Sequence, residues 1–214
     1  LLFLLPISAC NNEEPSKLSN DVRWVTQSSE YISLCEQIYR SAGLVLQNQF
    51  EGVDRPLIVM DLDETVLNNS SYQVELFETS KTYNPTSWNA WVNKEQATAV
   101  PGAKNFILEF KEKYEGWIVF ISNRDASTLN ATRNNLKSLG LLFEDDVFLL
   151  RKDKADTKVV RRNEILEGVG RMKNYGMHTV LAYFGDQMGD FPNDSSFVFS
   201  VNQFMFPNPM YGKW

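Results

Sequence analysis

The stretch Leu57-Ile-Val-Met-Asp-Leu-Asp-Glu-Thr-Val-Leu67 decides the fold of this chain. Its first four residues are all apolar, which is typical of a strand buried on both faces in the middle of a parallel sheet. Asp61 and Asp63 follow directly. Because side chains two positions apart on a strand share a face, both carboxylates are expected together at the strand end. Ligands of open α/β sheets bind outside the carboxyl ends of the strands, so the pair predicts a site.

Two other interpretations of these carboxylates compete with that prediction. A calcium loop would need Gly at its sixth position and Glu at its twelfth, where this chain has Val66 and Tyr72. A solvated turn after the strand is the second alternative, since Asp, Glu and Asn favour turns. Two unneutralised carboxylates side by side repel, so a site there would need a cation or a proton between them.

The composition describes an ordinary globular protein. The chain has 214 residues, of which 43% are hydrophobic, and it carries a net charge of −6. That length suits one substantial core, or a core with a small cap. The acidic balance argues against a nucleic-acid polymer as partner. No segment approaches the roughly 20 apolar residues that a membrane span needs.

The first residues differ from the rest. Leu1-Leu-Phe-Leu-Leu-Pro-Ile-Ser-Ala-Cys10 resembles the end of a secretory signal, and its last four residues resemble a bacterial lipobox, which predicts a lipid anchor at Cys10. The polar residues 11–20 suit a flexible tether. In such lipoproteins Asp after the cysteine is linked to inner-membrane retention, so Asn11 favours the outer membrane of the bacterial envelope. A buried N-terminal strand is the alternative.

The remaining chain alternates helices and strands, which predicts an α/β fold with a doubly wound parallel sheet. Between Asp21 and Phe50 apolar residues recur at helical spacing, so we expect one or two helices with Cys35 in their core. An irregular insertion, a lid or substrate wall, is expected at 68–100. The other predicted elements are strands at 117–121, 147–150, 179–184 and 196–201, and helices at 103–114, 126–139 and 157–168.

Further polar groups follow the predicted strand ends or begin the predicted helices. We expect them at the sheet edge that holds Asp61 and Asp63. A hydroxyl, a lysine and four aspartates at one edge suit phosphoryl transfer assisted by a hard metal ion. The added groups are Ser122, Lys158, Asp186 and Asp190.

These motifs resemble those of the class C nonspecific acid phosphatases, bacterial lipoproteins of the haloacid dehalogenase superfamily. The first signature is matched by Val59-Met-Asp-Leu-Asp-Glu-Thr-Val-Leu-Asn-Asn-Ser-Ser-Tyr72 and the second by Phe184-Gly-Asp-Gln-Met-Gly-Asp-Phe191. Gln187 and Met188 depart from the usual second signature. The resemblance implies a Rossmann-like sheet with a small helical or irregular cap at about 68–100. It divides the chain into a signal remnant, lipobox and tether (1–20) and a single phosphatase domain (21–214).

The resemblance also implies a mechanism. Asp61 would attack phosphorus as the nucleophile, and Asp63 would protonate the leaving group and then deprotonate water. Mg²⁺ would be the cofactor, held by the Asp61 carboxylate, the Asp63 backbone carbonyl and Asp186. Thr65 would orient Asp63. Ser122, Asn123 and Lys158 would bind the phosphoryl oxygens, and Asp190 would support Lys158 or the metal-bound waters.

The expected substrate is a phosphomonoester. Trp88, in Trp88-Asn-Ala-Trp91, and Tyr211, in Asn208-Pro-Met-Tyr-Gly212, correspond to aromatic walls that would sandwich the base of a nucleoside 5′-monophosphate. The alternative is that both rings only serve packing.

Several choices stay open on the sequence alone. A phosphotransferase would use the same residues, with an alcohol replacing water. A non-catalytic nucleotide- or haem-binding lipoprotein could share the fold, although the single His178 offers haem little ligation. Arg161 and Arg162 are expected on a solvated helix face. The oligomeric state, a homodimer included, is not determined.

Overall fold

A parallel five-stranded sheet forms the centre of the protein, seen in a computed structural model that describes residues 18–212. The strand order is β5-β4-β1-β6-β7, and each neighbouring pair is parallel. The predicted α/β class is therefore confirmed. The strands are β1 (Leu57–Met60), β4 (Trp117–Asp125), β5 (Val147–Arg151), β6 (Val180–Gly185) and β7 (Gln203–Met205).

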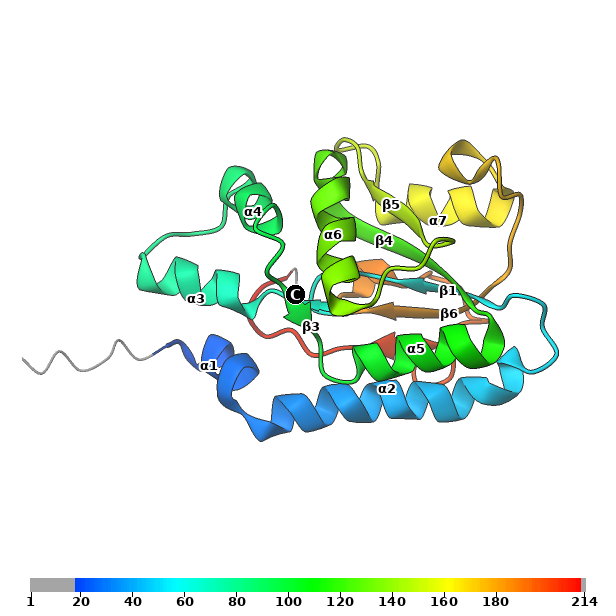
Figure 1. Ribbon diagram of the computed structural model, residues 1–214, viewed down its shortest axis with the longest axis horizontal. Coiled ribbons are helices and arrows are strands. Elements are labelled where there is room, and N and C mark those ends of the chain that lie inside the picture. Colours follow the sequence, from blue (N-terminus) through cyan, green and yellow to red (C-terminus); the bar gives the residue numbers. More distant parts are fainter. Residues whose placement is uncertain (1–17, 213–214) are drawn as a thin grey trace, which may run out of the picture.

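Helices cover both faces of this sheet (Figure 1). Alternate side chains of β1 point to opposite faces. Ile58 and Met60 belong to the core shared with α2, α5 and α6, whereas Leu57 and Val59 pack in a second core with α7. The helices outside the cap are α1 (Asn20–Gln27), α2 (Ser29–Phe50), α5 (Ala103–Tyr114), α6 (Leu129–Leu139) and α7 (Lys158–Glu167), with 3₁₀ turns η1 (Ala126–Thr128), η2 (Gly170–Met172) and η3 (Met188–Asp190).

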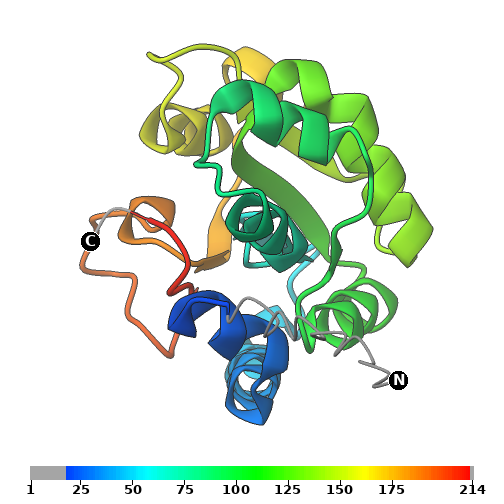
Figure 2. The ribbon, with the colours of Figure 1, turned by 90° about the vertical axis from the view of Figure 1, so that its left-hand side faces the viewer.

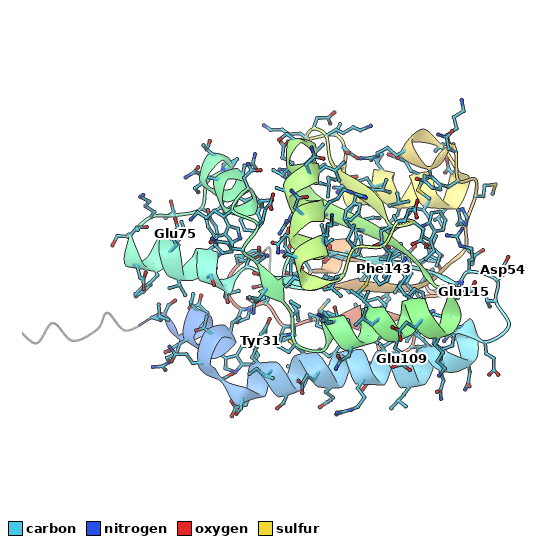
Figure 3. The ribbon with its side chains drawn as sticks, in the orientation of Figure 1. Tyr31, Asp54, Glu75, Glu109, Glu115 and Phe143 are labelled. Carbon is cyan, nitrogen blue, oxygen red and sulfur yellow. The ribbon has the colours of Figure 1, made fainter. Side chains whose placement is uncertain are left out.

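The N-terminal region forms two helices, within the predicted range. Ser28 separates them, and its hydroxyl caps α2 by accepting a hydrogen bond from the Tyr31 N–H at 3.1 Å. Tyr31, labelled in Figure 3, lies on the buried face of α2. Cys35 is fully buried on the same helix, as predicted for a thiol in the helix core.

The segment 68–100 is more regular than predicted, because it holds two helices. Asn84 explains one of them: its side chain accepts the Ser87 N–H at 2.9 Å, and Pro85 occupies the first turn. Figure 1 shows both helices standing apart from the sheet, beyond the strand ends. The elements of this cap are β2 (Leu67–Asn68), α3 (Ser70–Glu78), α4 (Pro85–Val92) and β3 (Thr98–Ala99).

The prediction of a strand at 196–201 is wrong. The side chains of Val198, Phe199 and Val201 are exposed, and the strand that joins the sheet is β7, just after them. Asn202 accounts for the difference: its side chain accepts the Val198 N–H at 2.6 Å and closes a loop before β7 begins. An apolar run therefore became a loop because its backbone bonds locally instead of pairing with β6.

The order of the strands places a crevice beside β1. From β1 the chain fills one side of the sheet with β4 and β5, then crosses to the other side with β6 and β7. Ligands of doubly wound sheets bind where the order reverses, outside the strand ends. Figure 2 views the molecule from the side on which the cap lies. Among the described helices, none is both long and apolar enough to cross a membrane.

Candidate active site

Asp61 lies at the end of β1, inside the β1/β6 crevice. Its backbone N–H donates to the Phe184 carbonyl of β6 at 2.9 Å, and its side chain is 5% exposed. Lys158, the first residue of α7, donates from Nζ to Asp61 Oδ1 at 2.5 Å. The same ammonium donates to Asp190 Oδ1. The structure thus brings together three predicted site residues from three separate elements.

Asp186 and Asp190 share a tight loop after β6. Asp190 Oδ2 accepts the backbone N–H groups of Asp186 at 3.0 Å and Gln187 at 2.9 Å. Gly185 permits this approach, because a Cβ there would lie 2.3 Å from the Asp190 Cβ. Asp186 Oδ2 accepts from Asn208 Nδ2 at 2.8 Å, which attaches the C-terminal segment to the site.

Burial and mutual repulsion set the electrostatics of this cluster. Burial, with Asp190 and Asp186 nearby, raises the pKa of Asp61 well above its usual value, although Lys158 opposes the rise. Burial and the Asp190 charge raise the pKa of Asp186 to about 7. Burial alone would lower the pKa of Lys158, but Asp61 and Asp190 raise it above normal. One lysine therefore faces more carboxylates than it neutralises.

The donor set fits a hard divalent cation. Asp61, Asp186 and Asp190 each offer an oxygen, and these oxygens lie within 4.8 Å of one another. Carboxylate oxygen is the ligand that Mg²⁺ prefers. Asp190 already accepts from Lys158 and from backbone N–H groups with its two oxygens, so Asp61 and Asp186 are the carboxylates with an oxygen to spare. The Asp63 side chain lies outside this cluster, which leaves its backbone carbonyl for such a role.

Asp63 turns its carboxyl the other way, toward the cap and β4. Its Oδ1 accepts from Arg124 Nε at 2.9 Å and Asn69 Nδ2 at 3.0 Å, and its Oδ2 accepts from Ser122 Oγ at 3.2 Å. Thr65, which the family resemblance assigns to help orient Asp63, makes no hydrogen bond to it, because its buried Oγ1 has no partner among residues 18–212. Local spacing could not predict this, since the orienting groups come from elsewhere in the chain.

Glu64 makes the sharp turn between β1 and β2. Its φ of 58° lies in the left-handed region, which is uncommon for a residue with a side chain. The buried carboxyl accepts the Asn69 N–H at 3.1 Å. Burial and the charge of Asp63 raise the pKa of Glu64 to about 8. The turn carries the chain from Asp63 at the sheet edge into the cap.

A cavity of about 630 Å³ opens above these groups, between the sheet edge and the cap. Trp88 of α4 and Tyr211 of the C-terminal segment both line it, so the two predicted aromatic walls meet at one cavity. Ser122, predicted to bind a phosphoryl oxygen, and Thr65 are fully buried and do not line it. Tyr83 and Arg151, which sequence reasoning missed, also line it. The other predicted residues in the lining are Asp61, Asp63, Asn123, Lys158 and Asp186.

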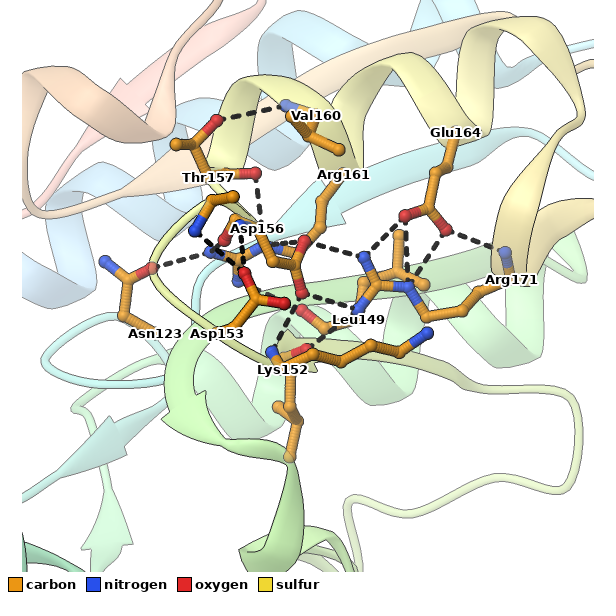
Figure 4. Close-up of polar contacts among 12 residues, drawn as sticks. Asn123, Leu149, Lys152, Asp153, Asp156, Thr157, Val160, Arg161, Glu164 and Arg171 are labelled. Atoms are coloured by element: carbon orange, nitrogen blue, oxygen red, sulfur yellow. Dashed lines mark hydrogen bonds and ion pairs between the residues drawn. The ribbon is translucent and has the colours of Figure 1, made fainter.

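Arg161 is not on a solvated face, contrary to prediction, and neither is Arg162: they are 0% and 6% exposed. Figure 4 shows the Arg161 guanidinium at the centre of a polar network. It donates to Asn123 Oδ1 at 2.7 Å, and to the carbonyls of Ser122, Leu149 and Asp156. It therefore joins the ends of β4 and β5 to the loop before α7. No local sequence signal distinguishes such a buried arginine from a solvated one.

Known acid phosphatases resemble this chain in sequence and in structure. A family model described as HAD superfamily, subfamily IIIB (acid phosphatase), matches residues 5–214. Two solved structures of the class C acid phosphatase from Bacillus anthracis, one with tungstate bound, are 31% identical. They cover 90% of this chain and 84% of that chain, with TM-scores of 0.73 and 0.74.

A plant protein is similar as well. The stem 31 kDa glycoprotein of Glycine max is 28% identical over 166 residues, which are 72% of this chain and 59% of that protein. The present chain thus spans less than two thirds of its length. The family model covers nearly the whole chain, and the structural likeness covers most of it. The chain belongs to the acid phosphatase subfamily IIIB of the HAD superfamily.

Proposed function

We propose that this protein is a Mg²⁺-dependent acid phosphatase that hydrolyses phosphomonoesters through an aspartyl-phosphate intermediate. The observation that supports it best is the convergence of Asp61, Lys158, Asp186 and Asp190 beside the β1/β6 crevice, with Asp63 two residues from Asp61. Tungstate is a tetrahedral oxyanion like phosphate, and its presence in the Bacillus anthracis enzyme fits a phosphoryl site in this fold.

The first step transfers the phosphoryl group to the protein. An Asp61 carboxylate oxygen forms a bond to phosphorus as the bond to the leaving oxygen breaks, and Asp63 gives that oxygen a proton. Water then attacks the phosphorus of the acyl phosphate and passes its proton to Asp63. The bond to Asp61 breaks, inorganic phosphate leaves, and both aspartates return to their starting states.

Cationic and polar groups assist at defined places. Lys158 lies against Asp61 and would hold a phosphoryl oxygen, with Asp190 fixing its position. Asn123 has its amide oxygen bound to Arg161, so its N–H₂ group is the end available to a phosphoryl oxygen. Mg²⁺, held by Asp61, Asp186 and the Asp63 carbonyl, would offset the repulsion between carboxylate and phosphate.

The test of this function is Asp61→Asn. The folded variant should lose about 10⁴-fold or more in turnover, because it lacks the nucleophile. Phosphate release is measured with EDTA, with added Mg²⁺ and with neither, and circular dichroism checks the fold. A folded variant that keeps a tenth of wild-type turnover would refute the mechanism. Phosphate recovered on an added alcohol instead of water would indicate a phosphotransferase.

Nucleoside 5′-monophosphates are the substrate class that we propose. Trp88 and Tyr211 line one cavity with the phosphoryl site, and stacking on an aromatic ring contributes about 1–3 kcal/mol per base. Trp88→Ala should therefore raise KM for a nucleoside 5′-monophosphate by roughly 10-fold. A small aryl phosphate should be affected less, since it reaches less of the cavity. Equal losses on both substrates would argue against a base-stacking site.

The proposed location is the bacterial outer membrane, through a lipid on Cys10. Cys10 and the tether up to residue 17 lie outside the described residues. The support is the lipobox-like run at residues 7–10 and the polar segment after it. With this anchor the cavity would face the periplasm or the cell surface.

A further inference from the structure

Arg124 is a buried cation that the mechanism above leaves without a role. It lies on β4 with 1% of its surface exposed. Its Nε and Nη2 both approach Asp63 Oδ1, at 2.9 and 2.8 Å, and its Nη1 donates to Thr132 Oγ1 at 3.1 Å. The guanidinium carbon lies 5.9 Å from the ring centre of Trp88. Arg124 therefore contacts the proposed acid and the proposed aromatic wall at once.

Asn69 makes a second link between Asp63 and the cap. It is fully buried, and its Nδ2 donates to Asp63 Oδ1 at 3.0 Å. Its Oδ1 accepts from the indole Nε1 of Trp91, on α4, at 2.9 Å. An indole N–H only donates, so Trp91 requires the amide oxygen of Asn69 on its side and turns the N–H₂ group toward Asp63.

These contacts place the two carboxyl oxygens of Asp63 in different surroundings. Oδ1 accepts from the N–H groups of Arg124 and Asn69, which hold it in place. Oδ2 has Ser122 Oγ at 3.2 Å, a hydroxyl that can accept as well as donate. Oδ2 is therefore the oxygen left to act on a substrate.

We infer that Arg124 and Asn69 are positioning residues, which hold Asp63 so that Oδ2 delivers the proton to the leaving group. Through them the acid is also tied to the cap, since Trp88 and Trp91 lie one turn apart on α4. A base stacked on Trp88 would lie on the ring that Arg124 approaches. The inference rests on the proposed phosphatase function and specifies which residues make Asp63 effective.

The experiment varies how much the leaving group needs a proton. kcat/KM is measured for a series of substituted phenyl phosphates of similar size, whose phenols differ in acidity. kcat/KM reports the steps up to transfer onto Asp61, where the acid acts. General acid catalysis contributes about 10²–10⁴-fold, so Arg124→Met should lose roughly 100-fold on the poorest leaving group and under about 10-fold on the best. Arg124→Lys, which keeps the charge, should lie between Arg124→Met and wild type.

Trp91→Phe tests the link to the cap with a smaller change. It removes one of the two N–H groups that hold the Asn69 amide oxygen, the other being Arg124 Nη2 at 3.4 Å, but keeps an aromatic ring. Trp91 does not line the cavity and, among the described residues, makes no hydrogen bond to Asp63. It should steepen the leaving-group dependence in the same direction, by about 3- to 10-fold at the poor end, in proportion to one lost hydrogen bond. Arg133→Met is the matched control. The Arg133 guanidinium lies over the Phe148 ring at 5.3 Å and, among the described residues, has no ion pair with Asp63, so the variant should leave the dependence unchanged.

The outcomes separate this inference from the proposed function. If wild type fails to turn over any of the phosphates, the proposed function fails. If wild type is active and Arg124→Met loses the same factor across the whole series, Arg124 is only structural and the inference is overturned. Urea denaturation shows whether each variant folds. If Arg124→Met does not fold, Arg124→Lys and Trp91→Phe decide the question. The inference is overturned if both show the same leaving-group dependence as wild type.

Discussion

Arg161→Met tests whether the buried guanidinium holds the polar side of the site together. Arg161 is fully buried, donates to carbonyls of three different segments and to Asn123, and lies 3.5 Å from Asp156 Oδ1 (Figure 4). Removing one partner of a buried ion pair costs about 3–5 kcal/mol. Asp156 would still have Arg171 Nη2 at 2.9 Å, so the cost of losing this ion pair lies toward the lower end of the range of about 3–5 kcal/mol.

The lost hydrogen bonds add to this cost. A hydrogen bond to a charged donor contributes about 1.5–3 kcal/mol, but a methionine of similar length fills part of the space and offsets some of the loss. We therefore expect Arg161→Met to lower the free energy of unfolding by about 3–5 kcal/mol. It should also raise KM, because Asn123 loses the contact that orients its amide.

The neighbouring arginine provides the control. Arg162 is 6% exposed, and within residues 18–212 its side chain makes one hydrogen bond, from Nη1 to the Gly189 carbonyl at 2.9 Å. Arg162→Met should cost about 1.5–3 kcal/mol, the loss of a single bond from a charged donor. Urea denaturation followed by circular dichroism gives both free energies, and phosphate release gives KM. Equal costs for the two variants would refute the assigned role of Arg161.

Three further predictions concern other parts of the chain. Burial would raise the pKa of Asp156 and of Glu164, but hydrogen bonds from Arg171 hold both pKa values below their usual range. The stability that these carboxylates contribute is therefore present at neutral pH and is lost as pH falls through their folded pKa values. Arg171→Met should lose less of its free energy of unfolding than wild type over the same fall in pH. Burial raises the pKa of the Cys35 thiol to about 12, so a thiol reagent at pH 8 should label it only on unfolding, and fast labelling would contradict the burial. Labelled palmitate should enter the wild-type protein and not Cys10→Ser, and absence of label from wild type would exclude the anchor.

The sequence alone determined the sheet and the order of its motifs. The apolar run of β1 followed by Asp61 and Asp63 is a local pattern, and alternating helices and strands leave few ways to arrange a parallel sheet. Once the sheet is parallel, the strand ends must meet at one edge. That geometry is enough to predict that Lys158, Asp186 and Asp190 approach Asp61, because each follows a strand or begins a helix.

Only the tertiary structure decided how the side chains at that edge are used. Arg124 and Arg161 look like ordinary surface residues in the sequence, since nothing local marks a polar residue that will be buried with partners far along the chain. The prediction of a strand at 196–201 was wrong for a related reason. Whether an apolar run becomes a strand depends on which segment pairs with β6, and in this fold the segment that pairs is β7. Propensity is local, whereas pairing and desolvation depend on the assembled fold.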